Sequence, residues 1–162
     1  MEVIIAFKKE DNSDSSLFTK ISAKAISWWT KHPYYHCELI FKNKWISSHP
    51  DLGGVRLLPL KELRPTWDYY KINLPEISTE QEEILWGFLQ EQINTGYDWK
   101  GIFLSQFMKL GINSDTKWFC SEIVVKLLQL MYCKTLIDYV PNKISPADLF
   151  RILEKELSKI KL

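Results

Sequence analysis

The sequence predicts an α+β fold in which an antiparallel sheet of about five strands packs against helices. Two observations lead to this expectation. Between residues 35 and 74, short apolar or alternating runs are separated by turn residues, which is typical of neighbouring antiparallel strands. From residue 78 onward, apolar residues recur at helical spacing. Because strands and helices are largely segregated along the chain, the fold class is α+β rather than α/β.

The chain has 162 residues, so we expect residues 1–162 to form a single domain with a real core. Its net charge is +1, which gives no overall attraction to nucleic acid or to an anionic membrane. The basic residues are dispersed and match no nucleic-acid-binding motif, so we expect no nucleic-acid partner. The sequence does not indicate an oligomeric state.

The first apolar run is short and is followed by acidic residues, which is unlike a secretory signal peptide. No stretch is apolar over the length of a bilayer, so no transmembrane segment is expected. The three cysteines, Cys37, Cys120 and Cys133, form no paired spacing, which favours a reducing compartment. We therefore expect a cytoplasmic or phage-associated location. We expect no cofactor and no metal, since no C-x-x-C spacing occurs and neighbours such as His36 and Cys37 point to opposite faces of a strand.

Each expected element rests on a local signal. The strands are expected at residues 3–7, 35–41, 44–48, 55–60 and 67–74, the last four as a meander that starts with a hairpin around Asn43. The helices are expected at 17–30, after a capping box at 78–81, at 102–110, at 120–131, and from Pro146 behind the cap Ser145. The C-terminal stretch EKELSKIKL is interpreted as a solvated helix face.

His36 is an unusual residue for a strand that reads as buried. Alternation places His36 and Glu38 on one face of the strand, and Cys37 on the other. Burying two ionisable groups on one face requires hydrogen bonds or a partner charge. The alternative is a barely buried face on an edge strand.

Cys120 is expected in the first turn of a helix. There the helix dipole and the backbone N–H groups favour a thiolate, and the same N–H groups suit an oxyanion. The alternative is a small buried hydrophobic residue, which is how we interpret Cys133.

A cysteine nucleophile needs a base, and the base needs a third polar group to orient it. His36 is the candidate base for Cys120. The candidates for the third role are Glu38, on the same strand face, and Ser48 or His49, across the hairpin. A residue across the hairpin has the better geometry for holding the ring nitrogen of His36 that faces away from Cys120. The sequence does not choose between Glu38, Ser48 and His49.

Four segments in series, YYHCELIF, GGVR, GYDW and FCSEIV, followed by SPADL, resemble the circularly permuted branch of the NlpC-like papain-fold cysteine peptidases, the YiiX-like amidase group. The resemblance covers most of the chain, from about residue 21 to residue 149. It implies a papain-like fold in which the histidine precedes the cysteine. The chain departs from the YiiX-like pattern in having no Glu at the hairpin position.

The resemblance implies a cysteine hydrolase, an amidase or peptidase that acts by thiol acyl transfer. Cys120 would be the nucleophile and His36 the base, while Tyr97 would line the pocket or donate to the oxyanion. The substrate would be a peptide or another amide, and peptidoglycan stem peptides are one candidate class. For Tyr97 the alternative is a core aromatic.

Two other functions remain open from the sequence. The first is a lipid acyltransferase or thioesterase like the distantly related lecithin retinol acyltransferase family, with a peripheral membrane contact through Trp28 and Trp29. The second is a catalytically inactive binding module on the same fold.

Overall fold

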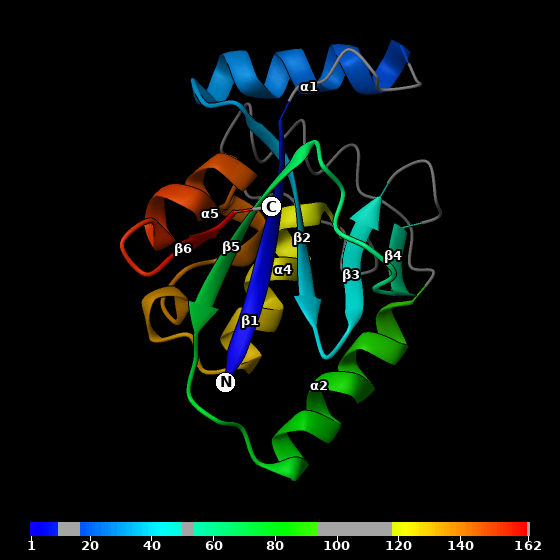
Figure 1. The fold of residues 1–162 in the computed structure, drawn as a ribbon, viewed down its shortest axis with the longest axis vertical. Helices are drawn as coiled ribbons and strands as arrows, with labels where there is room; N and C mark the ends of the chain where they lie inside the picture. Colours follow the sequence, from blue (N-terminus) through cyan, green and yellow to red (C-terminus); the bar gives the residue numbers. More distant parts are fainter. Residues whose placement is uncertain (10–16, 50–53, 94–117, 162) are drawn as a thin grey trace.

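The computed structural model describes residues 1–9, 17–49, 54–93 and 118–161 of the chain. Within them, six strands form one antiparallel sheet with helices packed on it, which confirms the α+β fold class (Figure 1). The strands are β1 (Glu2–Lys9), β2 (Tyr34–Phe41), β3 (Lys44–His49), β4 (Gly54–Pro59), β5 (Trp67–Asn73) and β6 (Ser158–Ile160). The helices are α1 (Leu17–Thr30), α2 (Thr79–Gln92), α4 (Cys120–Leu130) and α5 (Pro146–Leu153), with short 3-10 turns η3 (Lys134–Leu136) and η4 (Pro141–Lys143).

The strand order in the sheet is β4-β3-β2-β1-β5-β6, and this differs from the predicted meander. The hairpins β2–β3 and β3–β4 form as expected. The chain then leaves β4, crosses the sheet and adds β5 on the far side of β1, so that β1 separates β2 from β5 (Figure 1). The meander prediction failed because local turn signals report which strands are consecutive and do not report where the first strand inserts.

The C-terminal stretch was also predicted wrongly. Helix α5 ends at Leu153, and Ser158–Ile160 form β6, which pairs with the open edge of β5. The alternating Lys and Glu residues of this stretch suit a solvated helix, but they suit an exposed edge strand equally well. Pairing with β5, a partner distant in sequence, decides between the two.

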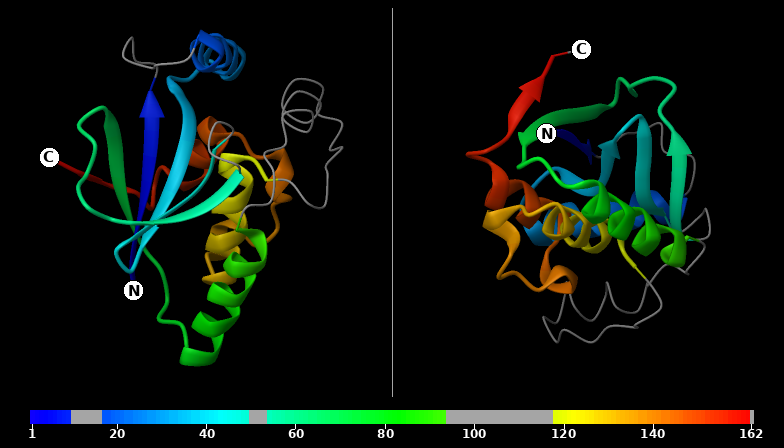
Figure 2. Two further views of the ribbon diagram at one scale, coloured as in Figure 1. Left: turned by 90° about the vertical axis from the view of Figure 1, so that its right-hand side faces the viewer. Right: turned by 90° about the horizontal axis from the view of Figure 1, so that it is seen from below.

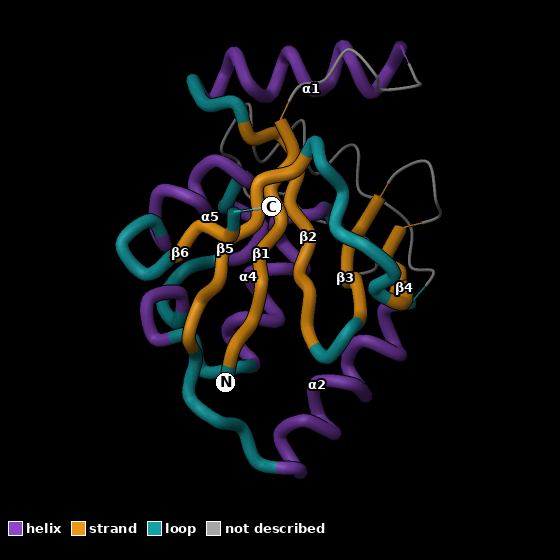
Figure 3. Tube along the Cα trace, viewed as in Figure 1, coloured by secondary structure: helices purple, strands orange, loops and turns teal. Residues whose placement is uncertain are grey.

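The two faces of the sheet bury different clusters of side chains. One face packs against α2, α4 and α5, and its main core includes Cys37, Leu39 and Phe41 of β2 (Figure 3). The opposite face carries a smaller aromatic cluster that includes Trp45, Trp67 and Tyr69. The segment between β4 and β5 passes over this second face, opposite the helices (Figure 2).

The helix boundaries follow the predicted caps where the structure describes them. Ser78 accepts a hydrogen bond from the backbone of Gln81 and opens α2. Ser145 and Asp148 form a capping box at the start of α5, with Pro146 in its first turn. The expected helix at 102–110 lies outside the described residues. In the described part of the chain, no helix is long and apolar enough to cross a bilayer.

Candidate active site

Strand β2 is buried along its whole length, and it lies between β1 and β3 in the interior of the sheet. His36 is 6% exposed and Glu38 is 1% exposed, so the alternative of a barely buried face on an edge strand is excluded. Both side chains lie on the aromatic face of the sheet. The partner of Glu38 on β1 is Ala6, whose small side chain leaves room for the carboxylate.

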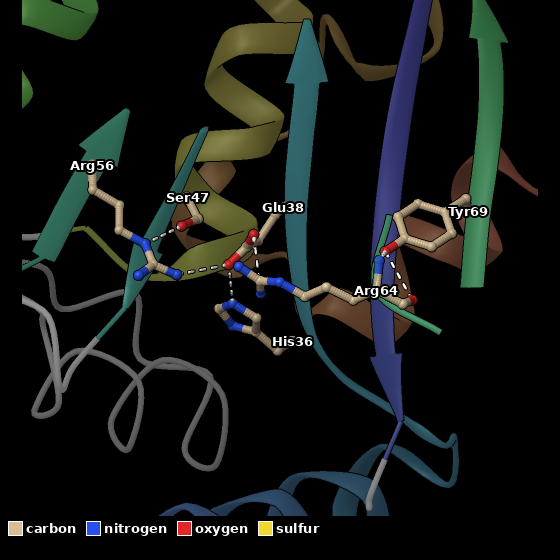
Figure 4. A network of polar contacts seen from close by, with 6 residues as sticks. All are labelled: His36, Glu38, Ser47, Arg56, Arg64 and Tyr69. Carbon is tan, nitrogen blue, oxygen red and sulfur yellow. Dashed lines mark hydrogen bonds and ion pairs between the residues drawn. The ribbon is translucent and has the colours of Figure 1, made fainter. Parts of the chain in front are cut away.

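The carboxylate of Glu38 is the centre of a buried polar network (Figure 4). Its Oε1 lies 3.3 Å from Nε2 of His36 and 3.2 Å from a guanidinium nitrogen of Arg56. Arg56 also donates to the hydroxyl of Ser47 at 3.0 Å. The guanidinium of Arg64 lies 4.0 Å from the second oxygen, Oε2. One histidine and two arginines therefore surround one carboxylate and offset part of the cost of burying it, although its Oε2 accepts no hydrogen bond from the described residues.

The aromatic cluster fixes the position of Arg64. Its guanidinium stacks on the rings of Trp45 and Trp67, at 4.9 Å and 5.2 Å from the ring centroids. The hydroxyl of Tyr69 accepts from the backbone N–H of Arg64 and donates to its carbonyl oxygen. The ring of His36 meets Trp67 edge to face at 5.7 Å. The aromatic residues thus hold both Arg64 and His36 around Glu38.

Cys120 is the first residue of α4, as the sequence predicted. The chain entering the helix is tied to the sheet, because Ser48 of β3 donates its hydroxyl to the carbonyl oxygen of Trp118 at 2.6 Å. Ser121 donates to the carbonyl oxygen of Ile144 at 2.6 Å. The N-cap residue Phe119 makes no side-chain hydrogen bond to the first turn. The helix start is therefore held from two sides, without a side-chain cap from Phe119.

The structure brings Cys120 and His36 together. The Cys120 side chain and the His36 imidazole interact, and each shifts the pKa of the other. Nε2 of His36 also contacts the Glu38 carboxylate, at 3.3 Å from Oε1. The imidazole therefore lies between a thiol at a helix start and a buried carboxylate.

The charges of these three groups support one another. Hydrogen bonds from Cys37 and the His36 imidazolium hold the pKa of Cys120 well below its usual value, although burial opposes this. Burial lowers the pKa of His36, but the Cys120 thiolate and Glu38 outweigh it and raise that pKa to about 9. Burial raises the pKa of Glu38, but His36, Arg56 and Arg64 together lower it to about 2. The arrangement favours a thiolate, an imidazolium and a carboxylate in a row.

The other residues singled out from the sequence fall in different places. Ser48 bonds to the carbonyl of Trp118, and the ring nitrogen Nε2 of His36 contacts Glu38. The side chain of His49 and all of Tyr97 lie outside the described part of the structure. Cys133 is buried just beyond α4, and burial raises its pKa. Of the two candidates whose side chains the structure describes, Glu38 and Ser48, Glu38 is the one that contacts the imidazole.

Cys37 has no role among those expected from the sequence. Its side chain lies in the main core, on the side of the sheet that packs against α4, and its thiol and backbone N–H lower the pKa of Cys120. His36 and Cys37 therefore both act on the same thiol although they are neighbours on β2. A signal was present in the sequence: alternation puts Cys37 on the core face, and the apolar helix that Cys120 opens must pack on that face.

No protein-family model, no curated protein and no solved structure matches the chain. Among the described residues, no group of three or more His, Cys, Asp and Glu side chains is arranged to hold a metal ion.

Proposed function

We propose that the chain is a cysteine hydrolase, an amidase or peptidase of papain-like type, with Cys120 as nucleophile, His36 as general base and Glu38 as the residue that orients His36. The observation that carries the proposal is the position of the His36 imidazole, between the Cys120 thiol and the Glu38 carboxylate. A nucleophile, a base and an orienting group in this order are what thiol acyl transfer requires.

The reaction would begin from the thiolate–imidazolium pair. The thiolate of Cys120 attacks the carbonyl carbon of an amide or ester, and the carbonyl oxygen becomes an oxyanion. The backbone N–H groups in the first turn of α4 are the donors that this proposal assigns to the oxyanion. Protonated His36 then gives its proton to the leaving amine or alcohol, and water resolves the acyl-enzyme with His36 as base.

The role of Glu38 in this proposal is to fix the imidazole. An ionised Glu38 accepts a hydrogen bond from Nε2–H, and in this proposal Nδ1 is then the ring nitrogen that serves Cys120. Arg56 and Arg64 support this role, because two adjacent positive charges keep the carboxylate ionised at neutral pH.

Cys120→Ala tests the function directly. We expect the parent chain to turn over members of a panel of chromogenic amides and esters, peptide-derived amides among them, and Cys120→Ala to turn over none of them. Cys133→Ala is the matched control, since it removes another buried thiol and should leave turnover unchanged. Turnover that survives in Cys120→Ala would exclude the proposal.

A lipid substrate, as in an acyltransferase or thioesterase, is the second candidate. It is favoured by α1, where Trp28 is 77% exposed, Trp29 is 44% exposed and Lys24 lies exposed one turn earlier. Exposed Trp next to Lys is typical of helices that lie in a membrane interface. Co-sedimentation with anionic vesicles that is lost in Trp28→Ala would favour this substrate class, and no co-sedimentation would favour a water-borne amide.

A further inference from the structure

The proposed reaction does not use the thiol of Cys37, which lies on the side of β2 that packs against α4, the helix that Cys120 opens. Cys37 is completely buried and Cys120 is 4% exposed. Both are free thiols. Each of the two side chains shifts the pKa of the other: the Cys37 thiol lowers the pKa of Cys120, and Cys120 raises the pKa of Cys37.

The two sulfurs differ in character. The sulfur of Cys120 faces the His36 imidazole and the Cys37 backbone N–H, which favour its thiolate. Cys37 has no such surroundings: burial and the nearby Cys120 and Glu38 charges raise its pKa, so it stays a neutral thiol. A stabilised thiolate beside a neutral thiol is the arrangement of an oxidation-sensitive cysteine next to a resolving cysteine.

We propose that a peroxide oxidises Cys120 and that Cys37 resolves the product into a reversible Cys37–Cys120 disulfide. The inference stands on the packing of α4, which Cys120 opens, against the face of β2 that carries Cys37, on the burial of both thiols, and on the chemical asymmetry of the pair. It assigns to Cys37 a protective and regulatory role at the site.

The chemistry balances with hydrogen peroxide as the oxidant. The Cys120 thiolate attacks one peroxide oxygen, the O–O bond breaks, and the leaving hydroxide takes a proton from the His36 imidazolium, which yields Cys120 sulfenic acid and water. The Cys37 sulfur then attacks the Cys120 sulfur, and its own proton leaves with the sulfenic hydroxyl as a second water. Overall, two thiols are oxidised to one disulfide and one peroxide is reduced to two waters.

Both thiols are free in this structure, so the Cys120 sulfur at the start of α4 and the Cys37 sulfur on β2 must approach each other to form an S–S bond of about 2.05 Å. The consequence for catalysis rests on the proposed function: with its sulfur in a disulfide, Cys120 has no thiolate to attack a carbonyl. Disulfide formation itself requires no substrate and no hydrolase activity. The two proposals therefore fail or succeed separately.

The test treats the parent protein with hydrogen peroxide, blocks the remaining thiols, and maps tryptic peptides without reduction. The three cysteines fall in separate tryptic peptides, residues 32–42, 118–126 and 127–134. We expect monomeric protein in which peptide 32–42 is linked to peptide 118–126, while peptide 127–134 carries a blocked thiol. Dithiothreitol should restore both thiols.

Cys37→Ala is the matched variant. Without a resolving thiol, Cys120 should proceed to sulfinic acid, which dithiothreitol does not reverse. The proposal is overturned if the treated parent protein contains Cys120 sulfinic acid beside a free Cys37, if Cys120 pairs with Cys133, or if no thiol is lost. The parent peptide map decides the question even where Cys37→Ala fails to fold.

Discussion

His36 and Glu38 are two residues apart on β2, and the Nε2 atom of His36 lies 3.3 Å from Oε1 of Glu38. Side chains at these positions share a face of the strand, and the long Glu38 side chain turns back to reach the ring. Arg56 holds the same carboxylate oxygen from β4 at 3.2 Å. Strand β2, inside the sheet, thus supplies the histidine and the carboxylate, and strand β4, at its edge, supplies the arginine.

Glu38→Gln should raise the apparent pKa of Cys120 and slow turnover. The substitution keeps the shape of the side chain but removes the charge that stabilises the His36 imidazolium, so the thiolate loses its counter-ion. We expect a fall in kcat/KM of about 10²-fold or more. The pH dependence of Cys120 alkylation measures the first effect. Glu82→Gln is the control, because Glu82 lies in an ion pair with Lys42 away from the site. It should change neither the apparent pKa of Cys120 nor kcat/KM.

The same substitution predicts a pH-dependent change in stability. Folding lowers the pKa of Glu38 from 4.5 to about 2, so its carboxylate contributes stability above pH 4.5 that is lost as the pH falls toward 2. Above about pH 5, the free energy of unfolding of Glu38→Gln should be roughly 3 kcal/mol lower than that of the parent chain. Urea denaturation at a series of pH values should show this difference shrinking in acid. A difference that is constant with pH would contradict the assigned ionisation.

Arg56→Met should destabilise the chain by about 1–3 kcal/mol, because it removes a charged hydrogen-bond donor from a buried carboxylate. Arg56→Lys keeps the charge but lacks the two-nitrogen fork that joins Glu38 to Ser47, so an intermediate loss is expected. Arg151→Met removes an arginine whose pair with Asp148 is exposed, and it should cost less than about 1 kcal/mol. Equal losses for Arg56→Met and Arg151→Met would show that Glu38 does not depend on Arg56.

Ser48→Ala should loosen the start of α4. It leaves the partly buried carbonyl of Trp118 without the hydroxyl that donates to it at 2.6 Å, which should cost about 1–3 kcal/mol. Because Trp118 lies two residues before Cys120, alkylation of Cys120 should also slow. Ser158→Ala, at an exposed position of β6, should affect neither stability nor alkylation. Normal alkylation in Ser48→Ala would mean that this bond does not position the thiol.

The parts of the fold that follow from local chemistry could be predicted from the sequence. Ser78 and Ser145 mark the helix starts at α2 and α5, because a hydroxyl that accepts from the third following N–H is a purely local device. The placement of β1 between β2 and β5, and the pairing of β6 with β5, depend on partners distant in sequence. Local patterns carry no information on either.

The candidate site divides in the same way. Alternation along β2 placed His36 and Glu38 on one face, and apolar spacing placed Cys120 at a helix start. The choice of Glu38 over Ser48 depended on how one side chain bends and on which arginines surround it, and no spacing rule reports that. The influence of Cys37 on Cys120 depends on how α4 packs against β2, and local sequence patterns do not report that packing.

The central claim is that Cys120 and His36 form a thiolate–imidazolium pair. The most direct measurement is the pH dependence of Cys120 alkylation by iodoacetamide, read from peptide 118–126 by mass spectrometry so that Cys37 stays in place. The parent, His36→Gln and the control His32→Gln would be compared. The account predicts an apparent pKa well below the ordinary value of about 8.5 in the parent and in His32→Gln, and a rise in His36→Gln. A thiol that titrates identically with and without His36 would contradict the account and favour an inactive binding module.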